Sequence, residues 1–403
     1  MSLNETILAL LDQYNEEAIE VRHYLHRHPE LSSKEFETSK YLKAFMTNLG
    51  YEIEAVEPDE ISAGTGFTAT LDTGRPGKTI GLRADIDALP VQETERNLAN
   101  ERIVRSENDG VMHACGHDGH MTTLLYAAKI LKQLEDKLSG KVIFIFEEAE
   151  ETNDGLPAML RHLEGRGIDA IYGNHLAAFL ESGKVSADPG PVMAAAAVIN
   201  FEVVGKGGHG SRPDLAVNPL FAGVDILNSI NIAWNNQINV EETVTLGLTQ
   251  FHVGELHNVF ADRAKIGGTL RYFNVEEGTK AYNTLMKVAN GVAAVHNCTI
   301  VEAPSAGPAT IPVINDEALA AQVKSGVEEL FPGHLAENVK WYASESFSHF
   351  SKIAPSVFSF IGTKNEELGS GAEHHNEYFD IDDASLRYGI GTMVKFTVDN
   401  LAN

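Results

Sequence analysis

The densest group of potentially reactive side chains lies between Met112 and His120. Nine positions there hold one thiol, three imidazoles and one carboxylate, with Cys115 and His117 at the centre. Cysteine and histidine are common ligands of zinc and of neighbouring transition metals, which favours a metal site. Two alternatives remain open: a helix-entry loop whose histidines cap or pack, and a structural zinc site. The latter commonly uses a second cysteine pair, and the only other cysteine is Cys298.

A second group, residues 147–151, places four carboxylates in five positions directly after the apolar run 141–146. Carboxylates this close repel one another unless a positive charge lies between them. The alternative is a solvated acidic turn without a functional role. Because ligands of open α/β sheets bind beyond the carboxyl ends of strands, the position favours a site.

Three further segments carry side chains of the same kinds. Residues 82–90 contain Arg83 and two carboxylates, residues 173–176 contain His175, and residues 373–377 contain two histidines. Each segment alone has a structural interpretation: an Arg83–Asp85 ion pair, a hydrogen-bonded core histidine, or an inert surface pair. Together they place ligand-type residues beyond several strands of one sheet.

Residues 205–210 match the spacing G-x-G-x-x-G that occurs in dinucleotide-binding folds. Pro213 suits the first turn of a helix, so the glycines would precede a helix instead of opening it. We therefore expect a flexible loop that presents His209. A dinucleotide-dependent oxidoreductase stays a distant alternative.

The elements that must position these residues follow from the hydrophobic periodicity. In the first half, the patterns predict a helix over 3–27, a strand over 78–82 ending at Arg83, a helix over 120–136, and strands over 141–146 and 168–172. Strands that alternate with helices indicate an α/β sheet with substantial parallel character.

A different order follows the break at 188–191. It comprises a strand at 197–204, a helix at 214–232, strands at 243–253 and 263–273, and a helix at 276–295, after which patterns resume at 315–331, 355–361 and 382–401. The order resembles a split βαβ sandwich. A chain of 403 residues exceeds the ~250–300 residues at which single cores stop growing. We predict an inserted domain at 193–305 within a discontinuous domain of 1–192 and 306–403.

The composition restricts the partners. A formal net charge of −26 argues against nucleic acid and anionic membranes. The two cysteines give no disulfide framework, and Cys298 is expected to be a plain buried residue. Neither a signal peptide nor an apolar run of about 20 residues is evident, so we expect a cytoplasmic protein.

On these motifs the sequence resembles the dinuclear metallo-aminoacylase and carboxypeptidase superfamily. Its similarity is to the branch of hippurate hydrolases, N-acyl-amino-acid amidohydrolases, N-acetyl-diaminopimelate deacetylases and auxin-conjugate hydrolases. The matching segments run nearly end to end: 26–31, 83–90, 112–120, Glu150-Glu151, 174–176, 207–209, and His375 with Phe379. The resemblance implies a zinc-exopeptidase-like α/β catalytic domain with a mixed, largely parallel sheet. It also implies an inserted ferredoxin-like α+β domain that serves as lid and dimer contact.

The resemblance further implies two divalent metal ions, Zn²⁺ or Mn²⁺, with Co²⁺ or Ni²⁺ as alternatives. Cys115 would bridge them, and the remaining ligands would be His117, Glu151, His175 and His375.

The other implied roles surround that site. Glu150 would be the general base, and Arg83 with Asp85 would orient the site from behind. His209 would stabilise the oxyanion, reaching the site of the second subunit in a homodimer. Asn258 and Arg271 would hold the substrate carboxylate.

Several positions depart from the family pattern. Glu147-Glu148 replaces Gln-Pro, Asp214 replaces a common histidine, Ser346 replaces an aspartate, and Glu377 replaces a frequent proline. None of these is an implied ligand, so they bear on substrate preference more than on mechanism.

The sequence therefore predicts a metal-dependent amidohydrolase that cleaves N-acyl amino acids or related small conjugates, using metal-activated water and a glutamate base. A dipeptidase or carboxypeptidase on the same scaffold is the alternative. A metal-binding protein without catalysis is a more distant one.

Overall fold

The computed structural model describes residues 2–402, which divide into two compact units. The first unit runs to Gly190 and includes Ile314–Val339 and the chain from His349 onward; the second comprises Pro191–Val313 and Lys340–Ser348. The second unit therefore includes 191–192, 306–313 and 340–348, which the sequence analysis assigned to the larger domain. Strand β14 (Gly307–Pro308) pairs with β8, and the Trp341 N–H donates to the Val192 carbonyl at 2.9 Å.

A sheet of seven strands, among residues 2–402, forms the centre of the first unit. Its order is β1 (Glu52–Ala55), β2 (Phe67–Asp72), β4 (Lys141–Glu147), β3 (Thr79–Asp85), β5 (Ala170–Glu181), β16 (Ser356–Lys364) and β6 (Val185–Ser186). The four strands β4, β3, β5 and β16 are parallel, and the outer strands pair antiparallel. The predicted mixed sheet with a parallel centre is confirmed, and the apolar run of β4 is buried, as parallel strands require.

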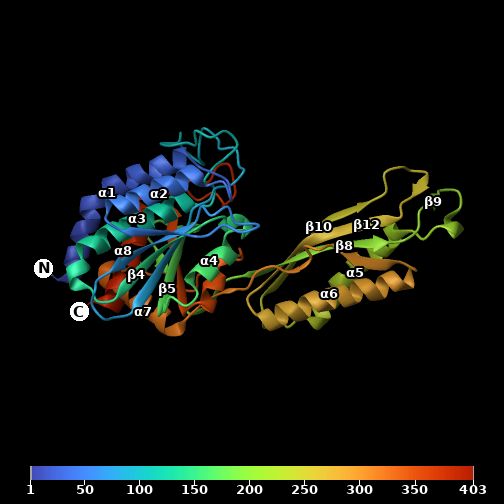
Figure 1. Ribbon diagram of the computed structural model, residues 1–403. Helices are drawn as coiled ribbons and strands as arrows, with labels where there is room; N and C mark the ends of the chain where they lie inside the picture. Colours follow the sequence, from blue (N-terminus) through green and yellow to red (C-terminus); the bar gives the residue numbers. More distant parts are fainter. Residues whose placement is uncertain (1, 403) are drawn as a thin grey trace. The chain divides into compact units, whose positions relative to one another are not determined.

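Helices cover this sheet, and four of them pack together on one side of it (Figure 1): α1 (Leu3–Arg27), α2 (Phe36–Asn48), α3 (His117–Gln133) and α8 (Leu386–Leu401). The others are α4 (Leu156–Leu163), α7 (Glu317–Leu330) and the 3₁₀ turns η1 (Glu135–Lys137), η2 (Glu150–Thr152), η4 (Ser346–Lys352) and η5 (Asp383–Ser385). Helix α1 begins with a capping box between Ser2 and Glu5 and coincides with the predicted helix.

Two differences from the predicted elements matter for the site. Helix α3 begins at His117 and not at position 120, so two histidines lie on its first turn. Strands β3 and β5 run past their predicted ends, and Arg83, Asp85 and His175 therefore lie within strands. Parallel pairing of Asp85 with Glu147 and of His175 with Phe360 keeps the backbone extended through these polar residues.

The second unit contains an antiparallel sheet in the order β10 (Val244–Val253), β12 (Arg263–Tyr272), β8 (Ala195–Val204) and β13 (Thr299–Glu302). Helices α5 (Pro219–Gln237) and α6 (Val275–Val295) share its hydrophobic core. The elements follow the predicted β-α-β-β-α-β order. Helix α5 starts at Pro219, because Pro213 opens the short turn η3 (Pro213–Leu215) instead. Short strands complete the chain: β7 (Gly190–Met193), β9 (Gly208–His209), β11 (Val259–Phe260) and β15 (Val313–Asn315).

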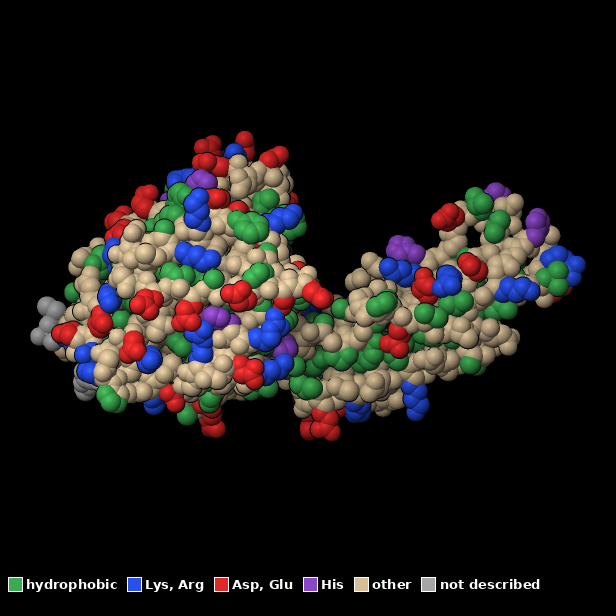
Figure 2. Space-filling model, viewed as in Figure 1, with side chains coloured by type: hydrophobic (Ala, Val, Ile, Leu, Met, Phe, Trp, Pro, Cys, Tyr) green, Lys and Arg blue, Asp and Glu red, His purple; other side chains and the backbone are tan. Residues whose placement is uncertain are grey.

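The surface seen in Figure 2 intersperses acidic and basic side chains, and no continuous basic stripe crosses that face. Within residues 2–402, none of the helices combines the length and the apolar character needed to span a bilayer.

Candidate metal centre

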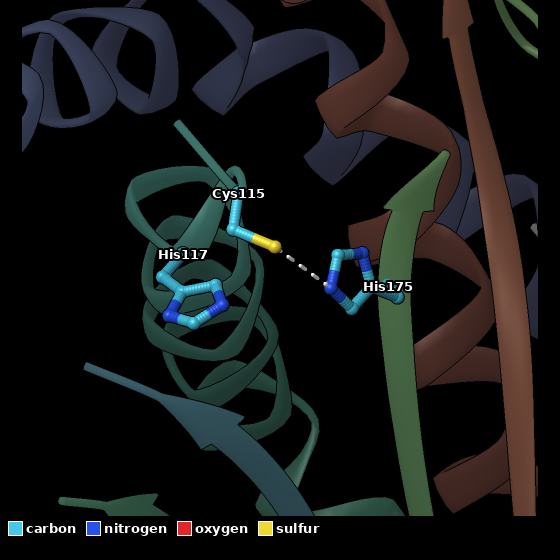
Figure 3. Close-up of side chains that lie close together, drawn as sticks. All are labelled: Cys115, His117 and His175. Atoms are coloured by element: carbon cyan, nitrogen blue, oxygen red, sulfur yellow. Dashed lines mark hydrogen bonds between the residues drawn. The ribbon is translucent and has the colours of Figure 1, made fainter. Parts of the chain in front are cut away.

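Cys115, His117 and His175 form one group of potential ligands (Figure 3), with donor atoms all within 4.8 Å of one another. Cys115 and His117 flank Gly116, whose φ of 86° makes the left-handed turn into α3. His175 extends from β5, and its Nε2 lies 3.5 Å from the Cys115 sulfur. The turn and the strand thus direct a thiol and two imidazoles into one space.

Cys115, Glu151 and His375 form a second such group within the same 4.8 Å limit. Glu151 lies on η2, and its Oε1 is 3.2 Å from His375 Nε2 and 3.7 Å from His117 Nε2. His375 has a left-handed φ of 62°, and its N–H donates to the Ala114 carbonyl at 2.9 Å. Because Cys115 belongs to both groups, the structure brings together all five residues that the resemblance implied as ligands.

The orientation and hydrogen bonding of these donor atoms are compatible with a bound cation. His175 Nδ1 faces the Leu176 carbonyl at 2.8 Å, so its proton lies there and the Nε2 lone pair points to Cys115. The buried atoms His117 Nε2 and Glu151 Oε1 make no hydrogen bond within residues 2–402. Buried polar atoms are rarely left without a partner. Sulfur, nitrogen and carboxylate donors around one space suit Zn²⁺ and related divalent ions.

Two aspartates lie behind His117. Asp85 Oδ2 accepts a hydrogen bond from Arg83 Nη1 at 2.8 Å, and its Oδ1 is 2.7 Å from His120 Nδ1 but 3.6 Å from His117 Nδ1. Asp87 Oδ1 is closer to His117 Nδ1, at 3.1 Å. The sequence analysis named Asp85 for this role and missed Asp87, although both carboxylates belong to the motif it singled out.

These contacts shift the ionisation of the buried groups. Burial disfavours the charge on His117, but Asp85 and Asp87 outweigh it and raise its pKa to about 10. Burial also opposes ionisation of Asp87, yet the contact with His117 lowers its pKa. For His175, burial and the neighbouring imidazoles hold the pKa well below its ordinary value, so this ring is neutral.

The acidic cluster separates into different roles. Glu147 accepts a hydrogen bond from Arg83 Nε at 2.6 Å, and Glu148 accepts hydrogen bonds from the backbone of residues 63–65. Glu150 and Glu151 form a third group with His117 within 4.8 Å. The side chains of Glu147 and Glu148 are therefore held by hydrogen bonds to neighbouring parts of the fold.

His374 is a further residue that the sequence analysis left out. Its Nε2 accepts the Ala178 N–H at 3.2 Å, so its proton lies on Nδ1, which is 3.7 Å from the Cys115 sulfur. His374 therefore donates toward the thiol, whereas His375 faces Glu151. The resemblance had already selected His375 as the ligand, and the structure adds the separate contacts that His374 makes.

The remaining site residues named from the sequence lie in the second unit. His209 and Asn258 are brought together, because β9 pairs with β11 and the Gly210 N–H donates to the Asn258 carbonyl at 2.8 Å. Arg271 lies on β12, and its Nη1 donates to the Ser344 hydroxyl at 3.1 Å. Asp214 forms a two-point ion pair with Arg212. The Ser346 hydroxyl donates to Glu345 Oε1 at 3.3 Å.

Known proteins resemble most of the chain. Residues 81–399 match the model of peptidase family M20/M25/M40. Thermostable carboxypeptidase 2 of Saccharolobus solfataricus is 31% identical over 96% of each chain. N-acyl-L-amino acid amidohydrolase of Geobacillus stearothermophilus is 34% identical over 73% of this chain and 77% of its own. The crystal structure of the Bacillus subtilis YXEP protein, a dinuclear metal-binding peptidase, has a TM-score of 0.81, with 28% identity over 96% of this chain and 98% of that one.

The family match covers most of the sequence, and all five potential ligands lie within it. The donor atoms that converge on Cys115 agree with a metal-dependent family. The chain belongs to peptidase family M20/M25/M40, and it is a metal-dependent hydrolase of amide bonds.

Proposed function

We propose that this enzyme hydrolyses N-acyl amino acids or related small conjugates at a pair of divalent ions held by Cys115, His117, Glu151, His175 and His375. The observation that carries the proposal is the position of Cys115, whose sulfur is common to two groups of donor atoms. One thiolate shared between two groups suits a bridging ligand. The similarity to an N-acyl-L-amino acid amidohydrolase supports the substrate class.

When bound, the ions would polarise the scissile carbonyl and lower the pKa of the attacking water toward ~7. Glu150 is 8% exposed and lies beside His117 and Glu151, which suits a base directed at that water. It would take the proton of the water and transfer it to the leaving nitrogen. General acid–base catalysis of this kind typically contributes ~10²–10⁴-fold.

His209 is suited to stabilise the oxyanion. Its Nδ1 accepts the Ser211 N–H at 3.2 Å, so the ring proton is on Nε2, and the side chain is exposed. We propose that the second unit serves as lid and homodimer contact, and that His209 donates into the site of the other subunit. Removing one oxyanion donor costs ~10²–10³-fold in kcat in comparable enzymes.

Arg271 and Asn258 would bind the substrate carboxylate. Within residues 2–402, the Arg271 guanidinium forms no ion pair with a carboxylate, and its one hydrogen bond goes to Ser344. Burial lowers the pKa of Arg271, which indicates a cation held partly out of water without a counter-ion. An anionic substrate would supply that counter-ion.

A carboxypeptidase or dipeptidase activity is the second candidate, favoured by the similarity to thermostable carboxypeptidase 2 over nearly the full length. Rates on N-acetyl and N-benzoyl amino acids against rates on dipeptides and acyl dipeptides separate the two. Higher kcat/KM on the peptides would replace the amidohydrolase assignment.

The general-base role is tested by Glu150→Gln, which keeps the shape of the side chain and removes the base. We expect bound metal to stay at the parental level and kcat to fall by at least ~10². Retained turnover would overturn the role of Glu150.

The role of His209 is tested with mixed dimers of Glu150→Ala and His209→Ala chains. These dimers should recover activity that neither homodimer has. No recovery would mean that the histidine does not act across the dimer.

A further inference from the structure

Ala149 makes an unusual turn directly before the two site glutamates. It is fully buried and adopts φ 53° and ψ 48°, the left-handed region. A residue with a Cβ stays in that region only where its surroundings hold it there. The turn sets the direction in which Glu150 and Glu151 leave the end of β4. Whatever holds Ala149 therefore also determines where both carboxylates point.

Glu35 is the first group that holds this turn. It is 0% exposed, and its Oε1 accepts the Ala149 N–H at 3.0 Å. The same oxygen accepts the Ser33 N–H at 3.0 Å, while Oε2 accepts the Thr65 hydroxyl at 2.9 Å. Glu35 thus joins the start of α2 to the backbone that precedes Glu150.

Glu148 holds the turn from the other side. Its Oε1 accepts the Ala63 N–H at 2.6 Å, and its Oε2 accepts the N–H groups of Gly64 and Thr65 at 3.0 and 3.1 Å. The Ser62 hydroxyl donates to Oε2 as well, at 3.0 Å. Successive backbone N–H groups around one anion form a strong anchor. Thr65 contacts both carboxylates, since its N–H donates to Glu148 and its hydroxyl to Glu35.

We propose that Glu35 and Glu148 are positioning residues that act through the main chain of Ala149 to hold Glu150 and Glu151 in their working orientation. The proposal rests on the roles given above to those two glutamates. Glu148 can fix the backbone at this turn only because its side chain is anchored, whereas a proline ring would fix φ by itself.

Substitutions at each glutamate test the two contacts separately. Glu148→Gln places an amide NH₂ among N–H donors, which breaks the anchor. Glu35→Gln keeps an oxygen for the Ala149 N–H, because the Thr65 hydroxyl can turn and accept from the amide. Glu35→Leu removes the acceptor. Glu60→Gln is the matched control, because Glu60 is an exposed residue of the neighbouring loop.

We expect Glu148→Gln and Glu35→Leu to lower kcat by about 10–100-fold, with KM within about twofold of the parent, because supporting contacts of a metal site have effects of this size. The affinity for Mn²⁺, measured by competition with a chelating dye in the absence of substrate, should fall in the same two variants. Glu35→Gln and Glu60→Gln should match the parent in both measurements.

The proposal is overturned if Glu148→Gln and Glu35→Leu match Glu60→Gln in kcat and in Mn²⁺ affinity, or if Glu35→Gln loses as much as Glu35→Leu. Should Glu35→Leu fail to fold, Glu148→Gln decides by itself, because it preserves the side-chain volume. Failure of the proposed function would give a different result. Glu150→Gln would keep its turnover, or the parent would hydrolyse no acyl amino acid. In that case the Mn²⁺ affinities of the Glu35 and Glu148 variants would still test the positioning roles.

Discussion

Asp87 connects two of the proposed ligands: its Oδ1 lies 3.1 Å from His117 Nδ1, and its Oδ2 accepts the Glu151 N–H at 3.1 Å. The Ser32 hydroxyl also donates to Oδ2, at 2.6 Å. One carboxylate thereby sets the orientation of an imidazole and the position of a glutamate that come from different segments of the chain.

Replacing Asp87 with asparagine should therefore weaken metal binding. An asparagine cannot accept equally from His117, Ser32 and the Glu151 N–H, and loss of such support costs about 10–100-fold in metal affinity or activity. Dye competition with Zn²⁺ or Mn²⁺ measures the change, with the exposed Asp109→Asn as control. An affinity equal to that of the control would show that Asp87 does not orient the ligands.

The adjacent histidines should behave differently from each other. His375 Nε2 faces Glu151 at 3.2 Å, whereas both ring nitrogens of His374 are directed at Cys115 and the Ala178 N–H. We expect His375→Gln to lower the number of metal ions bound per chain, and His374→Gln to retain them with an affinity about 10-fold weaker. Metal content after gel filtration distinguishes the two. Equal losses, or the reverse order, would contradict the assignment of His375 as the ligand.

Arg271 should affect substrate binding more than turnover. Arg271→Gln removes the cation proposed to pair with the substrate carboxylate, so KM for an N-acyl amino acid should rise at least ~10-fold, as loss of a charge-assisted contact implies. The same variant should act like the parent on the corresponding amino acid amide, which lacks that charge. Arg263→Gln, at an exposed ion pair with Glu202, is the control. A KM that changes equally for both substrates would argue against a carboxylate contact.

Glu35 should make the stability of the protein depend on pH. Burial and the nearby charge of Asp87 raise the pKa of Glu35 from 4.5 to about 7. Between these values the native state binds the proton more tightly than the unfolded chain, so this group lowers stability as pH rises from about 4.5 to about 7, by about 3 kcal/mol in all. Glu35→Gln does not titrate. Relative to the parent, its melting temperature should rise between pH 5 and pH 8, and a constant difference across that range would refute the shift.

The five potential ligands were named from the motifs and the family resemblance, and the structure brings these five side chains together. The sequence did not reveal the contacts that orient them. The sequence does not show whether Asp85 or Asp87 contacts His117, and only the fold brings Asp87 nearer to it. Glu147 and Glu148 depart from the family pattern and were expected to affect substrate preference. In the structure, their side chains are hydrogen-bonded to Arg83 and to the loop at 63–65. Strands β3 and β5 were predicted too short, because the polar residues that extend them are stabilised by partners distant in the sequence.

The central claim is that the five side chains hold a pair of metal ions. Crystals grown with Mn²⁺ and measured by anomalous scattering test it most directly. The account predicts two anomalous peaks per chain, both within about 2.6 Å of the Cys115 sulfur and each contacted by other members of the set. A single peak, or peaks that do not involve Cys115, would contradict it.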